Sequence, residues 1–576
     1  MQTRPMSPPD SCVPAEEVDL LVFGAGAGGM TAALVASLEG LNVLLCEKTG
    51  QVGGITATSG GTAWVPGTDL SIRAGVPDST ADAAAFLASV VGNRGGDALR
   101  QAFLDSGPAA IRELDEQTDA KFVAASAHPD YLGNHPGAAF GGRALAPLPF
   151  DGRLLGRDFA RIRPPRPEFM GPTGMMVARN ELDALLRPFA SLAHFKAAAG
   201  LLLRQAADRL RYPRGTRLVM GNALVARLFY SLRQRKVPVR FDTALRDLIV
   251  EQGRVVGARV DGPAGPATLR ARYGVVLATG GIAHNPALRA RLFPQSATRS
   301  LAPDGNTGDG VSAASRIGAP VDAGGDSPAL WMPTSVLNKP QGAEALWPHI
   351  LLDRAKPGLI AVNAAGRRFV NESDSYHDFV MGMLRAHETA PSVPAHLICD
   401  AAFLQQYGLG LALPGAKGRR RLVKAGYLIE APDLPTLAAR IGVDAAALQR
   451  TVERHNGFAQ TGVDADFGRG TSPMNRFNGD PAHTPNPCMR PIATAPYYAV
   501  AVWPADLAAS AGLQGDVDGR VLDESGAPIA GLFACGNDLA SIFRGTYPGP
   551  GTTIGPAMVF GWRIAKAAAK AAHLPS

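Results

Sequence analysis

The feature that most constrains this chain is a largely apolar run at residues 18–23 that leads directly into the glycine-rich stretch 24–29. A continuous apolar run is typical of a parallel strand that is buried on both faces. The glycines match the pattern G-x-G-x-x-G, and helical periodicity follows at 30–38. A second strand is expected at 42–46 and ends at Glu47. Together these elements predict a Rossmann-type βαβ unit.

This unit has the chemistry of a dinucleotide site. Glycines allow a tight turn, so that a pyrophosphate can approach the positive N-terminus of the following helix. The candidate glycines are Gly24, Gly26, Gly28 and Gly29. Glu47 is placed to accept hydrogen bonds from the ribose hydroxyls of the adenosine half.

The stretch after Glu47 favours FAD over a nicotinamide cofactor. A nicotinamide enzyme would normally continue into another helix, whereas this chain continues into a long loop that is rich in Gly, Ser and Thr. Such a loop can lay its backbone against a flat ring and its hydroxyls against phosphate. The candidate contacts are Lys48, Gly54, Thr56, Ser59, Gly60 and Gly61. Because 53–61 contains no His or Cys, we expect the FAD to be non-covalent.

Two later strands also end in candidate cofactor contacts. Residues 274–281 read as a buried strand that ends in glycines, with Ala278 and Gly280 facing the cofactor. Residues 531–537 read as a last strand, with Gly536 and Asn537 at its end. Both are expected to return to the nucleotide-binding sheet.

The Gly/Pro loop at 545–558 joins that last strand to a C-terminal helix. It offers the phenol of Tyr547 and several backbone N–H groups, and the helix that starts near Ile554 adds a partial positive charge. Such an arrangement can hold an oxygen, or a flavin ring, that carries developing negative charge. The alternative is a turn with a surface tyrosine, because Gly and Pro are common in turns.

Two further motifs accompany this loop. The segment 362–376 reads as a strand hairpin that ends in Asn371-Glu372 and reaches Tyr376. A helical stretch at 451–458 leads to 466–470. With the FAD fingerprint, these motifs resemble the 3-oxosteroid 1-dehydrogenases, also called 3-ketosteroid Δ1-dehydrogenases. Those enzymes belong to the fumarate reductase/succinate dehydrogenase flavoprotein superfamily. The resemblance extends from about residue 18 to 566.

The resemblance implies dehydrogenation of ring A beside the 3-ketone of a steroid. The tyrosine matching Tyr547 and the backbone N–H matching Gly551 hydrogen-bond the ketone oxygen. The tyrosine matching Tyr376 takes the C2 proton, that matching Tyr131 supports this base, and hydride passes from C1 to flavin N5. A tyrosine has an ordinary pKa near 10, so it needs such support to act as a base. Tyr376 and Tyr131 as buried structural phenols remain the alternatives. His377 is next to Tyr376, but adjacent residues usually point in different directions, so it is expected to be structural.

One segment departs from the family pattern. The family often carries a glycine-rich Asp-Leu-Gly-Thr-x-Gly-Gly segment beside the flavin, where this chain has Asp-Leu-Ala-Ala-Ser-Ala-Gly at 506–512. The additional methyl groups are expected to alter the packing against the flavin.

Other functions remain open from the sequence. One is a fumarate-reductase-like reduction of an unsaturated acid, for which Arg544 and Arg367 are candidate clamps. A second is a steroid dehydrogenase that acts at C4–C5. A third is a non-enzymatic flavin scaffold at a membrane.

The predicted fold class is α/β: a Rossmann-type FAD-binding domain with an inserted α+β catalytic domain. The expected division is an N-terminal tail at 1–17, the FAD-binding domain at 18–327 and 509–576, and the catalytic domain at 328–508. A small antiparallel sheet is expected from strands between 238 and 260.

The composition limits which binding partners and which cellular compartment are expected for this protein. The five cysteines show neither paired nor zinc-binding spacing, which fits reduced thiols in a cytoplasm and predicts no metal site.

Residues 187–240 hold twelve Lys or Arg and a single acid, Asp208. No recognition module for nucleic acid accompanies this charge. An apolar segment with basic edges at 187–217 instead favours peripheral binding to an anionic membrane, with an ordinary solvated helix pair as the alternative. No second nucleotide fingerprint is present, so a quinone or another acceptor is expected in place of NAD.

Overall fold

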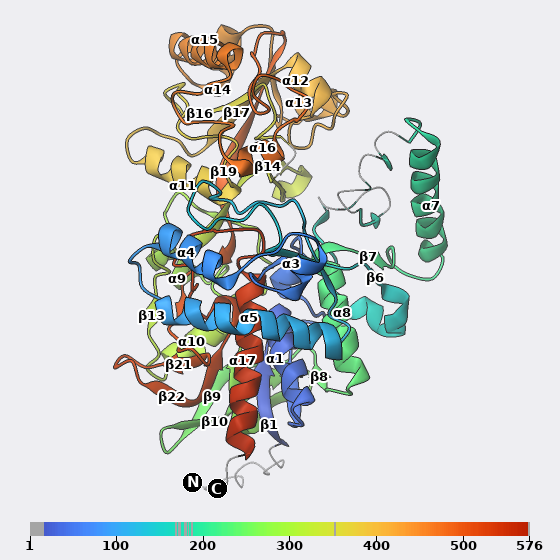
Figure 1. Ribbon diagram of the computed structural model, residues 1–576, viewed down its shortest axis with the longest axis vertical. Helices are drawn as coiled ribbons and strands as arrows, with labels where there is room; N and C mark the ends of the chain where they lie inside the picture. The colour runs from blue at the N-terminus through green and yellow to red at the C-terminus, as the bar shows by residue number, and fades with distance from the viewer. Residues whose placement is uncertain are drawn as a thin grey trace, which may run out of the picture.

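Two β-sheets organise the protein (Figure 1). The computed structural model describes residues 16–167, 170, 174–177, 181, 184–185, 188–350 and 353–573, and the structural statements below concern these residues. Of the tail expected at 1–17, residues 1–15 lie outside this description, and Glu16 and Glu17 already belong to the first strand.

The first sheet has the strand order β21-β22-β10-β11-β1-β2-β8, with β9 paired to β10. Its central strands β22, β11, β1 and β2 are parallel, as the apolar runs predicted. The strands are β1 (Glu16–Phe23), β2 (Val43–Cys46), β8 (Val239–Arg240), β9 (Ala244–Glu251), β10 (Arg254–Gly262), β11 (Gly265–Leu277), β21 (Arg520–Leu522) and β22 (Pro528–Ala534).

The expected separate antiparallel sheet is wrong in two respects. β8 pairs in parallel with β2, so it belongs to the nucleotide-binding unit. β9 and β10 are antiparallel, but they are continuous with the main sheet. The reason is the length of β11, whose first residues pair with β10 and whose last residues pair with β22.

Helices α1 (Ala27–Leu38) and α17 (Ile554–His573) lie side by side against the first sheet (Figure 1). Their close approach requires glycine, because a Cβ on Gly561 would lie 2.6 Å from the carbonyl oxygen of Gly28. Helix α5 (Asp97–Gln117) crosses α17, and Glu113 accepts hydrogen bonds from Trp562 and Lys566 of α17. The C-terminal helix therefore completes the domain that the N-terminal strand begins.

The second sheet has the order β15-β14-β19-β17-β16, and β12 and β18 also pair with β19. Its main strands are antiparallel, and helices α11 (Tyr376–His387), α14 (Leu434–Ile441) and α15 (Ala445–Thr461) surround it. The strands are β12 (Arg299–Ser300), β14 (Ala329–Asn338), β15 (Glu344–Pro348), β16 (Leu359–Val362), β17 (Ala395–Asp400), β18 (Ile429–Ala431) and β19 (Tyr497–Ala509).

The two long strands of this sheet, β14 and β19, lie close to the ends of the expected insertion at 328–508. One strand crosses that boundary, since β12 precedes residue 328 and pairs in parallel with β19. The structure is an α/β fold built on two mixed sheets. The division into domains at 18–327, 328–508 and 509–576 stays a prediction.

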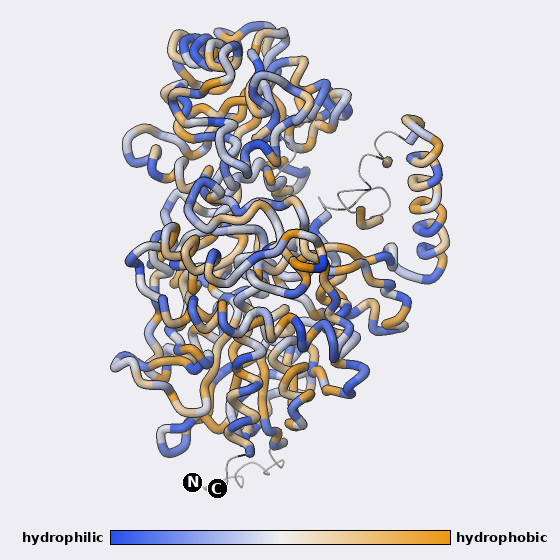
Figure 2. The backbone as a smooth tube through the Cα atoms, viewed as in Figure 1, coloured by the Kyte–Doolittle hydropathy of each residue, from blue (hydrophilic) through white to orange (hydrophobic). Residues whose placement is uncertain are grey.

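Helix α7 (Leu192–Arg209) stands away from the two sheets (Figure 1). Apolar side chains on it are exposed, among them Leu203 at 72%. Figure 2 shows hydrophobic and hydrophilic residues alternating along this helix, whereas the strands of the first sheet are mainly hydrophobic. None of the helices in the described ranges combines the length and the apolar character needed to cross a bilayer.

Candidate active site

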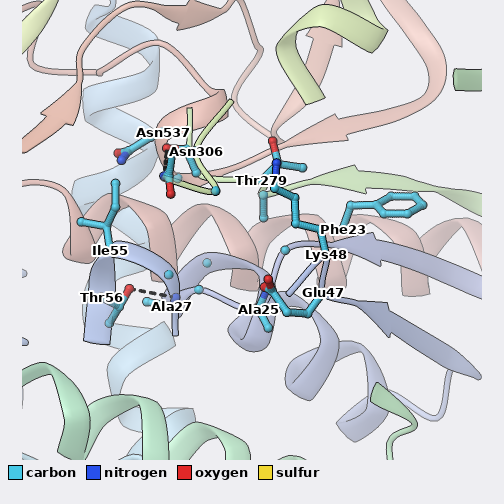
Figure 3. Close-up of a pocket in the computed structure, with 18 of the residues that line it drawn as sticks. Phe23, Ala25, Ala27, Glu47, Lys48, Ile55, Thr56, Thr279, Asn306 and Asn537 are labelled. Carbon is cyan, nitrogen blue, oxygen red and sulfur yellow. Dashed lines mark hydrogen bonds between the residues drawn. The ribbon is translucent and has the colours of Figure 1, made fainter. Parts of the chain in front are cut away.

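A deep pocket lies where β1, β2, β11 and β22 end (Figure 3). The ends of parallel strands are where open α/β sheets bind nucleotides. Thirteen of the sixteen residues expected to contact the cofactor line it: Gly24, Gly26, Gly28, Glu47, Lys48, Gly54, Thr56, Ser59, Ala278, Gly280, Gly536, Asn537 and Ile554.

The fingerprint glycines have two different tasks. A Cβ on Gly24 would lie 2.1 Å from the Ala278 carbonyl oxygen, and one on Gly29 would lie 1.9 Å from the Gly24 carbonyl oxygen. These two glycines let helix α1 and strand β11 approach the turn. A Cβ on Gly26 would instead have no protein atom closer than 3.9 Å, so it would project into the pocket. The space at Gly26 fits the pyrophosphate of a dinucleotide.

Glu47 is held in place at the end of β2 (Figure 3). One carboxylate oxygen accepts a hydrogen bond from Ala25 N at 3.0 Å, and the other accepts bonds from the N–H and hydroxyl of Thr49. Next to it, the Lys48 ammonium donates to Thr307 and lies 2.7 Å from Asp309. The carboxylate is oriented by protein donors, whereas the lysine charge already has a carboxylate partner.

Three expected cofactor residues do not line the pocket: Gly29, Gly60 and Gly61. Gly29 serves helix packing. Gly61 has φ of +72°, and a Cβ on it would lie 2.5 Å from Gly221 N, so this glycine makes room for helix α8 (Met220–Gln234). Gly60 is exposed.

Asp538 is a pocket-supporting residue that sequence reasoning missed. Its fully buried carboxylate accepts hydrogen bonds from the backbone N–H groups of Thr279 and Gly281, which follow β11. Burial raises the pKa of Asp538, while these donors oppose that rise. Because Asp538 follows β22, it ties the ends of two neighbouring strands together. The partners are more than 250 residues apart in the chain, so no local pattern could reveal them.

The three expected tyrosines meet in one buried cluster. The Tyr131 hydroxyl donates to that of Tyr376 at 3.2 Å, and the Tyr376 hydroxyl donates to that of Tyr547 at 2.9 Å. The rings of Tyr131 and Tyr547 are stacked, with centroids 5.4 Å apart, and Tyr376 stands edge-on to both. Hence three segments that are distant in sequence form one phenolic centre.

Burial raises the pKa of each of the three phenols. Burial raises the pKa of Tyr547 to about 12, although the hydrogen bond with Tyr376 opposes part of this rise. That of Tyr376 rises well above its ordinary value, because the neighbouring phenols add to the effect of burial. All three are therefore neutral hydroxyls at neutral pH, able to donate to an oxygen placed among them.

Tyr376 is positioned by its own helix and by its neighbour. It is the first residue of α11, where the helix dipole favours negative charge. The ring of His377 accepts from Trp331 N at 3.2 Å and donates to the Gly545 carbonyl at 2.9 Å. Burial lowers the pKa of His377. Both ring nitrogens of His377 are thus engaged by backbone, which matches its expected structural role.

Buried ions hold the turn before Tyr376. Glu372 is fully buried and binds the guanidinium groups of Arg368 and Arg469. Burial alone raises the pKa of Glu372, but the two arginines outweigh it and lower the pKa to about 2. Arg354 donates to the carbonyls of Glu372 and Asp374. Arg368 lies in this ion network, and the hairpin expected at 362–376 is wrong, because the strand β16 ends at Val362 and no second strand follows in the described residues before Tyr376.

Gly551 lies four residues after Tyr547 in the same Gly/Pro loop. It has φ of +98°, and a Cβ on it would lie 2.4 Å from the Thr62 carbonyl oxygen, so only glycine fits. Its carbonyl accepts from Trp64 N and Gly555 N. Among the residues that the structure describes, no acceptor pairs with the Gly551 N–H. That amide remains a donor for a ligand.

Apolar side chains of the second sheet surround the phenols. The buried members come mainly from β14 and β19, and α16 (Pro473–Asn478) contributes as well. They are Leu301, Leu330, Met332, Met474, Ala505 and Ala508, with Leu346, Ile350, Phe477 and Leu507 packed against them.

A smaller hollow connects the deep pocket with this cluster. It shares Gly536, Asn537, Thr553 and Ala557 with the pocket, and Leu330 with the apolar cluster. Ala509, one of the residues that depart from the family's glycine-rich pattern, lines it as well.

The comparisons with known proteins cover both sheets. A family model described as an FAD binding domain matches residues 19–554. The chain is 37% identical over 568 residues to a 3-oxosteroid 1-dehydrogenase of Mycobacterium tuberculosis (strain ATCC 25618 / H37Rv), which covers 96% of this chain and 98% of that protein. It is also 37% identical over 559 residues to a 4-oxocyclohex-2-ene-1-carboxylate 5-dehydrogenase of Sinomonas cyclohexanicum, covering 96% and 94%.

A solved structure agrees with these relatives. The crystal structure of 3-ketosteroid delta1-dehydrogenase from Sterolibacterium denitrificans, in complex with 1,4-androstadiene-3,17-dione, superposes with a TM-score of 0.89. It is 35% identical and covers 97% of this chain and 100% of that one. The family match and these relatives confirm FAD as the cofactor.

We predict that Gly26→Val weakens FAD binding without unfolding the protein. The new side chain would enter the space at Gly26 that fits the pyrophosphate. We expect FAD to bind at least about tenfold more weakly, a loss of roughly 1.4 kcal/mol or more. The measurement is the flavin released into the supernatant on acid precipitation of the purified protein, which also tests non-covalent attachment.

The matched control is Gly457→Val in helix α15, where a Cβ would meet open space. It should keep full flavin content. Equal flavin content in the two variants would show that Gly26 does not contact the cofactor.

Proposed function

The chain belongs to the 3-oxosteroid 1-dehydrogenase family of FAD-dependent oxidoreductases, and from that premise we propose that its substrate is a 3-ketosteroid. The membership confirms the resemblance and the enzyme class expected from the sequence. The observation that supports this substrate is the phenolic centre, which is enclosed by apolar side chains, one of which, Leu330, also lines the small hollow next to the flavin pocket. A steroid ring A offers one oxygen for the phenols and a hydrocarbon surface for the surrounding apolar wall.

We propose that Tyr547 and the Gly551 N–H hold the 3-ketone oxygen. The Tyr547 hydroxyl is a buried neutral donor, and the Gly551 amide has an unused N–H on the same loop. Removing a proton from C2 leaves negative charge on the ketone oxygen, and preorganised donors in a water-poor site stabilise such charge strongly. The loop therefore makes the C2 hydrogen acidic.

We assign the base to Tyr376 and its support to Tyr131. The Tyr376 hydroxyl is 2.9 Å from that of Tyr547, which matches the short separation of a ketone oxygen and its α-carbon. The α11 N-terminus favours the ionised form of Tyr376, and a Tyr131 that stays neutral and keeps donating to this oxygen would stabilise the phenolate. When bound, FAD supplies the acceptor for the hydride that leaves C1. The inserted segment 328–508, which carries Tyr376 and most of the apolar wall, acts as the catalytic domain in this proposal.

A 4-oxocyclohexanecarboxylate is the second candidate substrate, because the Sinomonas relative is equally similar to this chain. Such an acid needs a cation near the phenols. Arg166 lies at the edge of the apolar cluster, but its guanidinium donates to the carbonyls of Leu301 and Leu346. The apolar wall therefore favours the steroid.

The candidate clamps for a fumarate-like substrate lie elsewhere. Arg544 binds Asp322 and the Arg94 carbonyl. Arg367 lines a surface cleft beside α15 together with Arg450. Since neither arginine belongs to the apolar cluster, the geometry does not favour carboxylate reduction.

We propose that helix α7 binds an anionic membrane surface peripherally. Leu192, Phe195 and Leu203 recur at helical spacing and are exposed, so they form one apolar face. Lys196 and Arg209 are also exposed. The single acid of this segment, Asp208, is buried and neutralised by Arg153, which leaves the exposed surface basic.

Membrane binding would place the enzyme beside its lipid-soluble substrate. It would also place it beside a quinone, which we propose, with other acceptors as alternatives, to reoxidise the flavin. The described cysteines Cys46, Cys399, Cys488 and Cys535 are free and buried, which supports a cytoplasmic location. Cys12 and Arg187 lie outside the described residues.

We predict that anaerobic titration with a 3-ketosteroid that has a single C1–C2 bond bleaches the flavin. The corresponding 1,4-diene-3-one should not bleach it, because its C1–C2 bond is already oxidised. We expect 4-oxocyclohexanecarboxylate to reduce the flavin more slowly than the steroid. If 4-oxocyclohexanecarboxylate bleached the flavin faster than the steroid, this acid would be the favoured substrate.

We predict that the two phenols are separable by mutation. Tyr376→Phe removes the base and should abolish both exchange of the C2 hydrogen with solvent deuterium and flavin reduction. Tyr547→Phe removes one donor to the ketone oxygen, which typically costs roughly 100- to 1000-fold in kcat, and should also weaken steroid binding. The measurements are C2 exchange by mass spectrometry and stopped-flow flavin reduction.

Tyr498→Phe is the matched control, because Tyr498 is buried in β19 and donates to none of the phenols. It should exchange and reduce at the unmodified rate. If Tyr376→Phe exchanged the C2 hydrogen at the rate of the unmodified protein, Tyr376 would not be the base.

We predict that the protein floats with anionic liposomes and that salt weakens this binding, since exposed charges are screened within about 8 Å at physiological ionic strength. The double change Lys196→Glu and Arg211→Glu should weaken it by about tenfold or more, at roughly 1 kcal/mol per basic residue. Arg291→Glu with Arg420→Glu, both exposed but away from α7, is the matched control. Equal flotation of the two double variants, or flotation independent of lipid charge, would contradict the proposal.

A further inference from the structure

The residue before Tyr131 is a buried acid with donors from three segments. Asp130 is 2% exposed. One of its carboxylate oxygens accepts from the indole N–H of Trp64 at 2.8 Å. The other accepts from Arg143 at 2.7 Å and from Ala139 N at 3.0 Å. Both oxygens of Asp130 are therefore fixed.

Arg143 joins this carboxylate to a second one. Its buried guanidinium donates to Asp78 at 2.9 Å and to the Gly137 carbonyl at 2.9 Å. A buried ion cluster is weak evidence for stability, because apolar side chains of the same volume often serve as well. None of these charges takes part in the proposed reaction, so the cluster calls for a different explanation. Its position directly before Tyr131 indicates a role in placing that tyrosine.

Trp64 connects the same cluster with the Gly/Pro loop. Its backbone N–H donates to the Gly551 carbonyl at 3.1 Å. A Cβ on Gly549 would lie 2.5 Å from the Trp64 indole nitrogen, so the loop rests directly on the indole. The ring itself is held by Phe103, stacked at 6.3 Å, and by Phe543, edge-on at 5.6 Å. Trp64 is a fixed contact between the two loops.

Two hydrogen bonds connect the loop that carries Tyr131 to the residues around Tyr547. The Tyr131 N–H donates to the Pro548 carbonyl at 2.8 Å, next to Tyr547. The Asp130 carboxylate binds Trp64, on which the loop of Tyr547 rests. The first hydrogen bond is between backbone atoms and the second is between side chains. Together they restrict the movement of Tyr131 relative to Tyr547.

We propose that Asp130 and Trp64 are positioning residues that hold the Tyr131 hydroxyl against Tyr376 and Tyr547. This inference rests on the proposed dehydrogenation, in which Tyr131 supports the base. The hydrogen bond between the Tyr131 and Tyr376 hydroxyls is 3.2 Å, near the long end of its range, so a small displacement of the Tyr131 loop would break it. Without that bond, the phenolate of Tyr376 is less stabilised and less populated, while the ketone donors remain.

The test compares Trp64→Phe with Trp562→Phe in the FAD-loaded protein. Each change removes one indole–carboxylate hydrogen bond and keeps an aromatic ring. Trp562 binds Glu113 at 2.9 Å between α17 and α5, away from the phenols. Asp130→Asn is a second variant of the same shape, in case Trp64→Phe folds poorly. The readouts are flavin content, the Kd for a 3-ketosteroid, the rate of C2 exchange, and a crystal structure of each variant.

In Trp64→Phe and Asp130→Asn we expect C2 exchange to slow about tenfold, the effect of losing one hydrogen bond to the base. Flavin content and steroid Kd should stay within about twofold of the unmodified protein, a difference of roughly 0.4 kcal/mol. Trp562→Phe should exchange at the unmodified rate. Exchange at the unmodified rate in both site variants would overturn the inference, as would a loss of flavin and steroid binding in proportion to the loss of exchange.

The proposed function fails separately, if the unmodified protein exchanges no C2 hydrogen of any 3-ketosteroid. The crystal structures then decide the inference alone. A Tyr131–Tyr376 oxygen separation that lengthens beyond hydrogen-bonding distance in Trp64→Phe supports it, and an unchanged separation overturns it.

Discussion

Three buried hydroxyls that hydrogen-bond to one another set the main constraint on this structure. A hydroxyl removed from water is costly unless it is hydrogen-bonded. Tyr131 donates to Tyr376, and Tyr376 donates to Tyr547, although these residues are 245 and 171 positions apart in the chain. Apolar side chains surround them. Both sheets must therefore be in place before the phenols can be satisfied, which couples assembly of the fold to assembly of the site.

The architecture meets this constraint by returning the chain to the first sheet. Strand β22 pairs with β11, and the loop that follows it carries Tyr547 to the start of α17. The second sheet supplies the apolar wall and, through α11, Tyr376. The flavin pocket opens at the ends of the parallel strands, and the small hollow beside it is lined by Leu330, which also packs in the apolar cluster around the phenols. The proposed site thus lies where residues of the two sheets come together.

The sequence predicted best those features whose physical reasons are local. The glycine turn, its helix and Glu47 lie within one βαβ unit, so their spacing alone indicates a dinucleotide site. Local pattern could not distinguish Gly26, whose missing Cβ leaves room for a ligand, from Gly61, whose missing Cβ leaves room for the protein backbone. Asp130 and Asp538 escaped prediction because their partners lie on distant segments. The tyrosines came from family resemblance, since no spacing indicates that they would meet.

The most direct test of this account is a crystal structure of the FAD-loaded protein with a 1,4-diene-3-ketosteroid bound. The account predicts that the 3-ketone oxygen lies within hydrogen-bonding distance of both the Tyr547 hydroxyl and the Gly551 N–H, with C2 facing the Tyr376 hydroxyl. A steroid bound with its ketone away from Tyr547, or with C2 out of reach of Tyr376, would contradict it.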